Sequence, residues 1–367
     1  MSFGKTIKKL RRERDMTQEH LAEILSISPQ AISRWETDMA MPDISLISPL
    51  CNLFNITSDE LLGIDLTRRQ EAVDAICDEA DKYSSRGYLE KAYEILADGL
   101  QKYPDNCDII YNLMYVCSWR KDVTGDRKYL EEAIKWGEKI LGQSTEDYQR
   151  HSAIQVLCFA YKADGRVEEA IKIAESMPII AVSQEMLMSN IYSKSRGYAA
   201  KQIKTNTLLQ HLSNSLFFLQ TTLDSGEKAY TAAEDAILRD KRIALLHLFF
   251  ENGDFGFYHM HLYDTHREQA FYYAKESEAD KALMHLGLAA EHAVKFITSV
   301  NEECTSLVFR GKDRGTWSTN YSENGAFCLL KVMENAVFDK IRENEEFIRI
   351  KQYLAEYAGK WSVESST

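Results

Sequence analysis

The sequence predicts an all-α protein in which a small helical bundle precedes a longer array of helix pairs. Three observations support this prediction. The chain has 367 residues and only five prolines, while Ala, Leu, Glu and Lys, which favour helix, recur throughout. Apolar residues recur at spacings of three and four, with no alternating strand pattern longer than a few residues. A pattern of small, aromatic and turn residues then occurs twice after residue 67.

The first three helices of the bundle are predicted from apolar spacing and from N-cap residues. Phe3, Ile7 and Leu10 lie on one face of a first helix that ends at Asp15-Met16. Thr17 is an N-cap for a second helix over residues 18–25. Ser28 caps a third helix, and Pro29 fits its first position because that backbone nitrogen needs no partner. The apolar residues expected to face the core of the second and third helices are Leu21, Ile24, Leu25, Ile32 and Trp35.

Two further helices are expected to complete the bundle. The apolar residues of the fourth are Ile44, Ile47, Leu50, Cys51 and Phe54. Pro49 must lie in or near its first turn, because a later proline would kink it. A short fifth helix, capped by Ser58, brings Leu61 and Leu62 onto the core.

The segments TQEHLAEILSISPQAISRWE and MPDISLISPLCNLFNITSDELLGID resemble the Cro/phage-repressor helix-turn-helix family, also called the XRE family. The resemblance covers roughly residues 3–66 and implies that the helix beginning at Ser28 enters the major groove of DNA. It implies that Gln30, Ser33 and Arg34 face base edges, since glutamine can pair with adenine and arginine with guanine. The DNA-binding residues implied in this way are Gln18, Ser28, Pro29, Gln30, Ser33 and Arg34.

Several positions in this module carry expectations other than base contact. Gln18 begins the second helix, where its side chain and the backbone amides would bind phosphate. Arg11 and Glu36 match a structural salt bridge of the family and are expected to pair with each other. Pro29 departs from the polar residue common at its position, which leaves only apolar contact with that base. A basic run at residues 5–14 suits contact with phosphate, but an ordinary charged helix face is an equal alternative.

The second part of the chain shows a helix-pair repeat. A helix is expected to resume at about Leu66 without a flexible linker. The first repeat has its small, aromatic, turn, small, large and terminating residues at Ala80, Tyr83, Gly87, Ala92, Leu96 and Pro104. The spacing recurs at Cys158, Tyr161, Gly165, Ala170 and Ala174. These positions resemble the tetratricopeptide (TPR) repeat, in which small residues let two antiparallel helices approach closely.

The resemblance implies a right-handed TPR-like α-solenoid over residues 67–367, after a helix-turn-helix domain over residues 1–66. Between the two repeats, residues 108–119 and 129–141 form another helix pair, joined by a polar turn at residues 120–128. A degenerate fourth unit starts at residues 186–196. Beyond it we expect further helices without a consensus, and a long polar loop at residues 309–325 that contains Trp317.

A concave face of the solenoid is the expected ligand site. Aromatic and amide side chains at concave offsets would suit an extended peptide, because amides can pair with its backbone. The residues placed there are Tyr111, Tyr115, Gln155, Phe159 and Asn190. The alternative is that these side chains pack between neighbouring repeats.

Charge and cysteine usage narrow the class of protein. The net charge of −12 argues against a protein that coats nucleic acid indiscriminately. The seven cysteines include no C-x-x-C pair and are typical of reduced cytosolic thiols. The longest apolar stretch, residues 244–250, is too short to cross a bilayer. We therefore expect a cytoplasmic protein.

No enzyme, cofactor or metal site is expected. The sequence contains no P-loop, dinucleotide-binding fingerprint, G-x-S-x-G or H-E-x-x-H motif. Histidines gather in FYHMHLYDTH at residues 257–266, but His259 and His261 point to different faces of a helix. Packing inside an aromatic-rich segment is the preferred interpretation of these histidines.

The order of a repressor-type head and TPR helices resembles the Rgg/PlcR-like peptide-pheromone receptors of Gram-positive quorum sensing. That resemblance implies a homodimeric transcription regulator whose repeats sense a peptide or protein signal and alter the spacing of two recognition helices. The C-terminal helices are expected to supply the dimer interface. A different hypothesis is an adaptor whose repeats bind a protein partner and whose head serves docking only.

Overall fold

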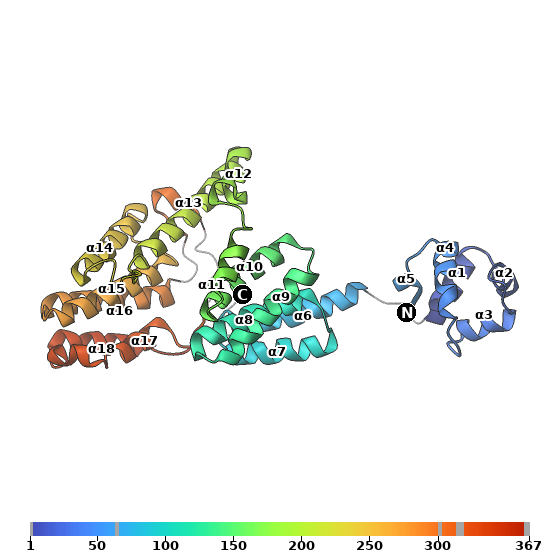
Figure 1. Ribbon diagram of the computed structural model, residues 1–367, viewed down its shortest axis with the longest axis horizontal. Coiled ribbons are helices and arrows are strands. Elements are labelled where there is room, and N and C mark those ends of the chain that lie inside the picture. The colour runs from blue at the N-terminus through green and yellow to red at the C-terminus, as the bar shows by residue number, and fades with distance from the viewer. Residues whose placement is uncertain (1–2, 63–65, 300–302, 313–318, 363–367) are drawn as a thin grey trace. The chain divides into compact units, whose positions relative to one another are not determined.

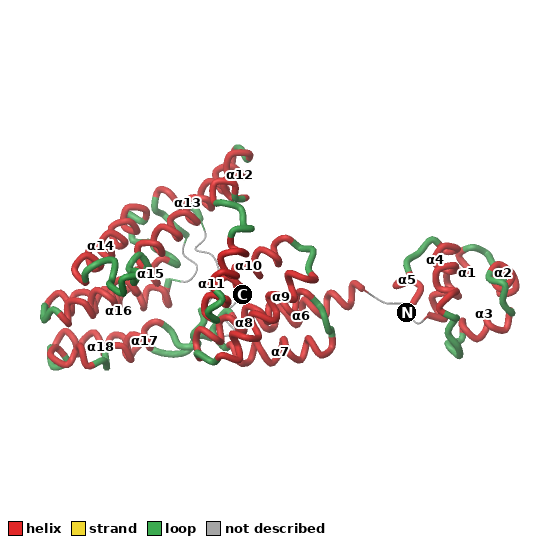
Figure 2. Tube along the Cα trace, viewed as in Figure 1, coloured by secondary structure: helices red, strands yellow, loops and turns green. Residues whose placement is uncertain are grey.

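The structure is a computed structural model that describes residues 3–62, 66–299, 303–312 and 319–362. These residues are almost entirely helical, as Figure 2 shows, and pair as β-structure only at isolated bridges such as Thr222–Lys228. The prediction of an all-α protein is confirmed. Within the described ranges, no helix combines the length and the hydropathy that a membrane crossing requires.

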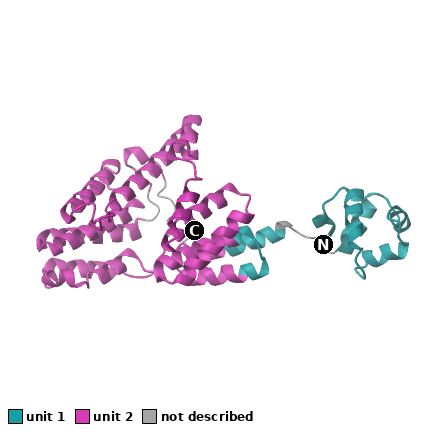
Figure 3. Ribbon diagram, in the orientation of Figure 1, with its two compact units in different colours: residues 1–78, 99–109 teal, residues 79–98, 110–367 magenta. Residues whose placement is uncertain are grey.

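The chain divides into two compact units, coloured in Figure 3: residues 1–78 with 99–109, and residues 79–98 with 110–367. The boundary between residues 66 and 67 that the sequence suggests stays a prediction. A separate apolar core does lie within residues 3–62, where Ile7, Leu21 and Ile32 are fully buried.

The N-terminal bundle contains five α-helices and one 3-10 turn among the described residues (Figure 1). They are α1 (Phe3–Glu13), α2 (Gln18–Ile24), α3 (Pro29–Glu36), η1 (Ile44–Leu46), α4 (Ile47–Phe54) and α5 (Ser58–Leu62). The Thr17 hydroxyl accepts from the His20 amide at 3.1 Å, and the Ser28 hydroxyl accepts from the Ala31 amide at 3.2 Å. Both N-caps predicted for the second and third helices are therefore confirmed.

Three details of the bundle differ from the sequence-based expectations. Ile24 is 44% exposed, and Ala22 is buried with Leu21 instead. Ile44 is 87% exposed, because it starts a 3-10 turn that precedes α4 and so leaves the apolar face of that helix. Thr57, one residue before the predicted cap, accepts from the Glu60 amide at 3.2 Å and caps α5.

The remaining chain forms a series of helices, many of which pack against their neighbours in sequence, including α9 on α10, α10 on α11 and α15 on α16. The first are α6 (Leu66–Ser84), α7 (Leu89–Lys102), α8 (Cys107–Thr124), α9 (Arg127–Gln143), α10 (Asp147–Ala163), α11 (Val167–Ala174), η2 (Ile180–Val182) and α12 (Gln184–Ile191). They continue with α13 (Lys194–Phe217), α14 (Ala232–Phe249), α15 (Tyr258–Lys275), α16 (Ala279–Thr298), η3 (Leu307–Phe309), α17 (Gly325–Val332), η4 (Ala336–Ile341) and α18 (Glu345–Tyr357).

The repeat positions around the two turns have the geometry that their spacing predicts, but Ala174, the last position of the later repeat, is exposed and not packed between helices. Ala80 and Ala92 are buried, and Gly87 adopts a φ of 77° in the turn between α6 and α7. In the later repeat, Gly165 adopts a φ of 83° between α10 and α11, and Ala170 is buried. Glycine meets the requirement for a left-handed conformation without a side-chain clash.

The prediction of a polar turn at residues 120–128 is wrong. Helix α8 continues to Thr124, and only Gly125 and Asp126 separate it from α9. Arg120 is buried, with its guanidinium 3.8 Å from the centre of the Tyr129 ring, and it forms an ion pair with Glu90. A charged residue thus continues the helix because its charge is paired and its flat face stacks on an aromatic ring.

The C-terminal segment of the described chain packs against the first repeat turn. The Thr319 amide donates to the Ser85 carbonyl at 3.0 Å, and the Tyr88 hydroxyl donates to the Trp361 carbonyl at 2.8 Å. A Cβ atom at Gly87 would lie 2.2 Å from the carbonyl carbon of Tyr321. Glycine is therefore required at this turn by close approach as well as by its φ angle. Residues 319–324 form no helix, in keeping with the expected loop, while Trp317 lies outside the described residues.

Candidate nucleic-acid interface and ligand pocket

Helix α3 presents one buried face and one exposed face. Ile32 and Trp35 are buried against the bundle, where the Trp35 ring meets the Phe3 ring edge-on at 6.4 Å. Gln30, Ser33 and Arg34 are exposed on the other side of the helix. Because residues three and four apart share a helix face, these three polar side chains form one continuous surface.

Ser28 and Pro29 fix the start of α3. The Ser28 hydroxyl caps the helix, and Pro29 occupies its first position, half-buried. Between α2 and α3, Ser26 adopts a φ of 55°, a left-handed conformation that reverses the chain direction. The local sequence therefore holds the exposed face of α3 in a defined orientation within the bundle.

A buried ion pair anchors α3 to α1. Arg11 Nε lies 2.5 Å from Glu36 Oε1, and Arg11 Nη2 lies 3.0 Å from Glu36 Oε2, in a bidentate arrangement. Burial by itself raises the pKa of Glu36, but hydrogen bonds from Arg11 and Gln18 outweigh it and lower the pKa below its ordinary value. The expected pairing of Arg11 with Glu36 is confirmed, and Arg11 is committed to the scaffold.

Gln18 joins this ion pair. Its Nε2 atom donates to Glu36 Oε2 at 2.8 Å, and its side chain is half-buried. One amide hydrogen is therefore used inside the bundle, and a phosphate would meet the remaining amide atoms and the backbone at the start of α2. On α1, Arg14 donates to the Leu53 carbonyl and also belongs to the scaffold, while Lys5 and Arg12 are exposed.

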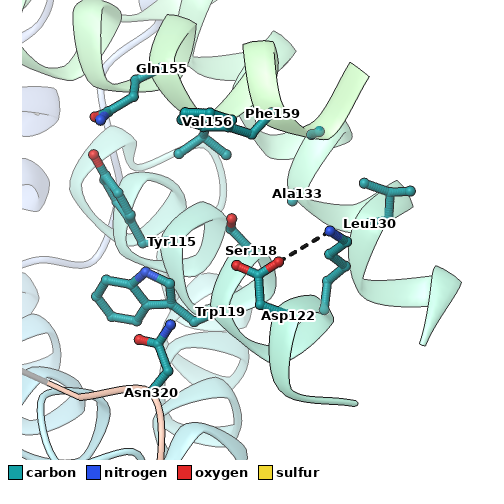
Figure 4. Close-up of a pocket in the computed structure, with 12 residues that line it drawn as sticks. Tyr115, Ser118, Trp119, Asp122, Leu130, Ala133, Gln155, Val156, Phe159 and Asn320 are labelled. Carbon is teal, nitrogen blue, oxygen red and sulfur yellow. Dashed lines mark hydrogen bonds and ion pairs between the residues drawn. The ribbon is translucent and has the colours of Figure 1, made fainter. Parts of the chain in front are cut away.

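A pocket of about 260 Å³ lies between α8 and α10. In Figure 4, Tyr115 and Trp119 come from α8, Gln155 and Phe159 face them from α10, and Asn320 lies beside Trp119. The structure thus brings three of the five expected ligand residues, Tyr115, Gln155 and Phe159, into one pocket. Phe159 is 68% exposed, so its ring is available to a ligand rather than packed between repeats.

The other two expected ligand residues lie elsewhere. The Tyr111 ring is 5.2 Å from the Tyr115 ring and 5.9 Å from the Tyr148 ring, beside the pocket. Tyr148 lines an adjoining pocket of about 470 Å³ that shares Gln155 and Phe159 with the first. Asn190 is on α12, lines neither pocket, and donates to the Met186 carbonyl of its own helix at 3.1 Å.

Sequence reasoning missed several lining residues. Trp119 and Tyr148 complete an aromatic surface around the pockets, and Trp119 follows Tyr111 and Tyr115 at intervals of four on α8. That helical spacing could have identified Trp119. Asn320 reaches the pocket from a loop far along the chain, and no sequence signal marks it.

Residues 7–61 match the family model described as Helix-turn-helix, so the N-terminal bundle is a helix-turn-helix domain. The chain is 36% identical over 76 residues to the HTH-type transcriptional regulator ImmR of Bacillus subtilis, an alignment that covers 21% of this chain and 60% of that protein. It is 39% identical over 63 residues to the HTH-type transcriptional activator BcrR of Enterococcus faecalis, covering 17% of this chain and 31% of that protein. The chain thus spans about a third to three fifths of the length of these two relatives.

Two solved structures resemble much of the chain at low similarity. One is Bacillus thuringiensis PlcR in complex with the peptide PapR7 and DNA, with a TM-score of 0.32 and 16% identity over 79% of this chain and 94% of that one. The other is the apo form of the competence regulator ComR from Streptococcus vestibularis, with a TM-score of 0.27 and 14% identity over 80% of this chain and 91% of that one.

Proposed function

We propose that the protein is a sequence-specific DNA-binding transcriptional regulator, with residues 1–66 as its DNA-binding domain and residues 67–367 as a sensing and dimerisation domain. The observation that carries the proposal is the exposed polar face of α3 within a helix-turn-helix domain. The relatives that the chain matches are named as transcriptional regulators, which agrees with this proposal.

Gln30 and Arg34 are the proposed base-reading residues. They are four residues apart, exposed, and on the face of α3 opposite the buried Trp35. An arginine can donate two hydrogen bonds to guanine, and a glutamine can pair twice with adenine. Ser33 lies between them, Ser28 and Pro29 approach the DNA at the start of the helix, and Gln18 contacts phosphate from α2.

The test begins with genomic fragments that the full-length protein retains in a selection. The double substitution Gln30→Ala/Arg34→Ala removes both proposed base contacts. We expect it to weaken binding of the tightest-binding fragment by about 2–6 kcal/mol, at about 1–3 kcal/mol for each contact. Fluorescence anisotropy at fixed salt measures the change. Asn52→Ala, an exposed change on α4, is the matched control and leaves affinity unchanged.

The result also separates the regulator from an adaptor. An adaptor that uses its head only for docking binds no fragment specifically, so the double substitution has no effect on DNA. Equal affinity of the double variant and the wild type for every retained fragment would therefore reject the proposed regulator.

We propose further that the pockets beside Phe159 bind an extended peptide. The exposed Phe159 ring and the aromatic rings around it offer apolar contact, and Gln155 can pair with a peptide backbone. The probes are short peptides encoded beside the gene, titrated by calorimetry. We expect Phe159→Ala to abolish binding, whereas Leu248→Ala, at a residue of similar exposure on α14, leaves it intact. Peptide binding that is unchanged in Phe159→Ala would show that the peptide does not bind in these pockets.

A further inference from the structure

A second and larger cavity, of about 510 Å³, lies among α13, α14, α15, α16, α17 and the segment that precedes α17. It shares no lining residue with the pocket between α8 and α10. Aromatic side chains form part of its wall, among them Phe217, Phe257, Tyr263, Phe296 and Trp361. Its size falls in the range of cavities that bind small organic molecules.

Arg242 on α14 lines this cavity and is only 2% exposed. Its Nε atom donates to the Ser213 hydroxyl at 3.0 Å, and its Nη1 atom donates to the His261 carbonyl at 3.0 Å and to the Thr265 hydroxyl at 2.7 Å. The guanidinium also lies 4.4 Å from the centre of the Phe217 ring. Each of these partners is uncharged.

Within the part of the chain that the structure describes, no carboxylate lies within ion-pair distance of Arg242, and Nη2 makes no hydrogen bond. A buried charge without a counter-charge is costly, and protein interiors normally pair it. The cost appears in the pKa of Arg242, which burial lowers to about 10. The guanidinium therefore lacks an anion at the edge that carries Nη2.

The two carboxylates that line the cavity, Asp264 and Glu323, form no ion pair with Arg242. Asp264 is paired with Arg267, with an Oδ1–Nη1 distance of 3.0 Å. Burial lowers the pKa of His261 to about 3, which keeps its ring neutral, and its Nδ1 atom is 2.9 Å from the Ser213 hydroxyl. Glu323, half-buried, accepts from the Ser322 hydroxyl at 3.1 Å. Asp264 attracts Arg242 only from beyond ion-pair distance, so the guanidinium of Arg242 has no direct ionic partner among the described residues.

We propose that this cavity binds a small organic acid with an apolar body, whose carboxylate pairs with Arg242 and whose body lies against the aromatic walls. The planar guanidinium matches a carboxylate in geometry, and the aromatic rings bury the rest of the molecule. The site is independent of the proposed DNA-binding face and of the proposed peptide pockets.

The test uses a fluorescent fatty acid, dansyl-labelled undecanoate, and its uncharged methyl ester as the control ligand. Trp361 lines the cavity, so binding transfers energy from tryptophan to the dansyl group. We expect the full-length protein to bind the acid tighter than the ester by about tenfold or more, the usual effect of one charge-assisted hydrogen bond. Equal affinity for acid and ester would overturn the proposal.

Two substitutions place the ligand. Arg242→Met removes the positive charge. We expect this variant to bind the acid only as tightly as the ester and to bind the ester as the wild type does. Met260→Trp fills the cavity and abolishes binding of both, whereas Met284→Trp, an exposed change on α16, binds as the wild type does. If Arg242→Met does not fold, the comparison of acid with ester still tests whether the site prefers a carboxylate, and Met260→Trp still tests whether the ligand lies in this cavity. Unchanged binding by Met260→Trp would exclude this cavity.

Discussion

At the scale of the residue, the pair formed by Arg11 and Glu36 joins α1 to α3, the proposed recognition helix. Its side chains are 10% and 2% exposed, and Gln18 adds a third hydrogen-bonding group. Because α1 and α3 are joined at this point, the pair orients the α3 face that carries Gln30 and Arg34. Its role is structural, and we propose that it influences DNA affinity only through the position of α3.

We expect Glu36→Gln to destabilise the N-terminal domain by about 3–5 kcal/mol, because it leaves Arg11 buried without its counter-charge. Glu13→Gln is the control. It removes the exposed pair with Lys9, at 3.7 Å, and should cost less than about 1 kcal/mol. Calorimetry of the full-length protein measures both. A loss in Glu36→Gln no larger than in Glu13→Gln contradicts this account of the pair.

Part of the bundle could be predicted from the sequence residue by residue. The caps at Thr17 and Ser28 and the pairing of Arg11 with Glu36 are local or follow a fixed motif, and each is confirmed. The prediction that Ile24 and Ile44 face the core is wrong, because apolar spacing does not show where a helix ends or where a 3-10 turn rotates the following residues. Tertiary packing decides which apolar residues are covered.

At the scale of the element, helices α15 and α16 are joined by buried histidines. His259 and His292 have Nδ1 atoms 2.9 Å apart, as do His266 and His285, and the His266 and His292 rings are stacked at 5.7 Å. The partners are 33 and 19 residues apart, so the sequence could not pair them. Among the described residues, no group of three potential ligands is arranged to hold a metal ion.

These histidines make stability depend on pH. Burial lowers the pKa of His266 to about 3 and of His292 to about 4, and it lowers the pKa of His285 as well. The unfolded chain, with histidine pKa values near about 6.5, therefore binds more protons than the folded chain below that pH. Stability is full above about pH 6.5 and falls as the pH decreases, by up to about 1.4 kcal/mol per pH unit for each histidine.

Urea unfolding of the full-length protein at several pH values between about 7 and 5 measures this slope. The double substitution His266→Phe/His285→Phe should reduce it, whereas His151→Gln, at an exposed position, should not. Stability that stays constant over this range contradicts the assignment of neutral histidines to the α15–α16 interface.

The repeats show which parts of an element follow from sequence. Gly87 and Gly165 mark turns correctly, because a left-handed backbone conformation favours glycine. The sequence predicts Arg120 in a turn, because a charged residue is usually exposed. In the structure an ion pair and ring stacking allow Arg120 to be buried within a helix. The Arg242 cavity could not be predicted, because it combines residues of five helices and of their connecting segments that no repeat consensus covers.

At the scale of the whole molecule, we propose that the regulator acts as a homodimer. One recognition helix reads only a few base pairs, so two copies are needed to specify a site, and their half-sites lie about one helical turn of DNA apart. Helix α18 in the C-terminal region exposes Tyr353 and Tyr357, whose rings are 5.5 Å apart, and Ile348 on another side of the helix. We propose that these exposed apolar side chains belong to the dimer interface.

Light scattering at micromolar concentration should therefore give the mass of a dimer. Ile348→Asp should produce a monomer, because it places a charge in the proposed apolar interface. Ile171→Asp is the control, since this residue has a closely similar exposure on α11, 47% against 44% for Ile348. A wild-type protein that is monomeric under these conditions contradicts the dimer.

The most direct test of the central claim is the ratio of affinities for a selected operator and for a scrambled duplex of equal length, measured in one salt concentration. If α3 reads bases, the wild-type protein gives a ratio of about 1,000 or more, as specific DNA-binding proteins do, and Gln30→Ala/Arg34→Ala lowers it sharply while binding to the scrambled duplex is retained. A wild-type ratio near one, or a ratio that the double substitution leaves unchanged, would contradict the account.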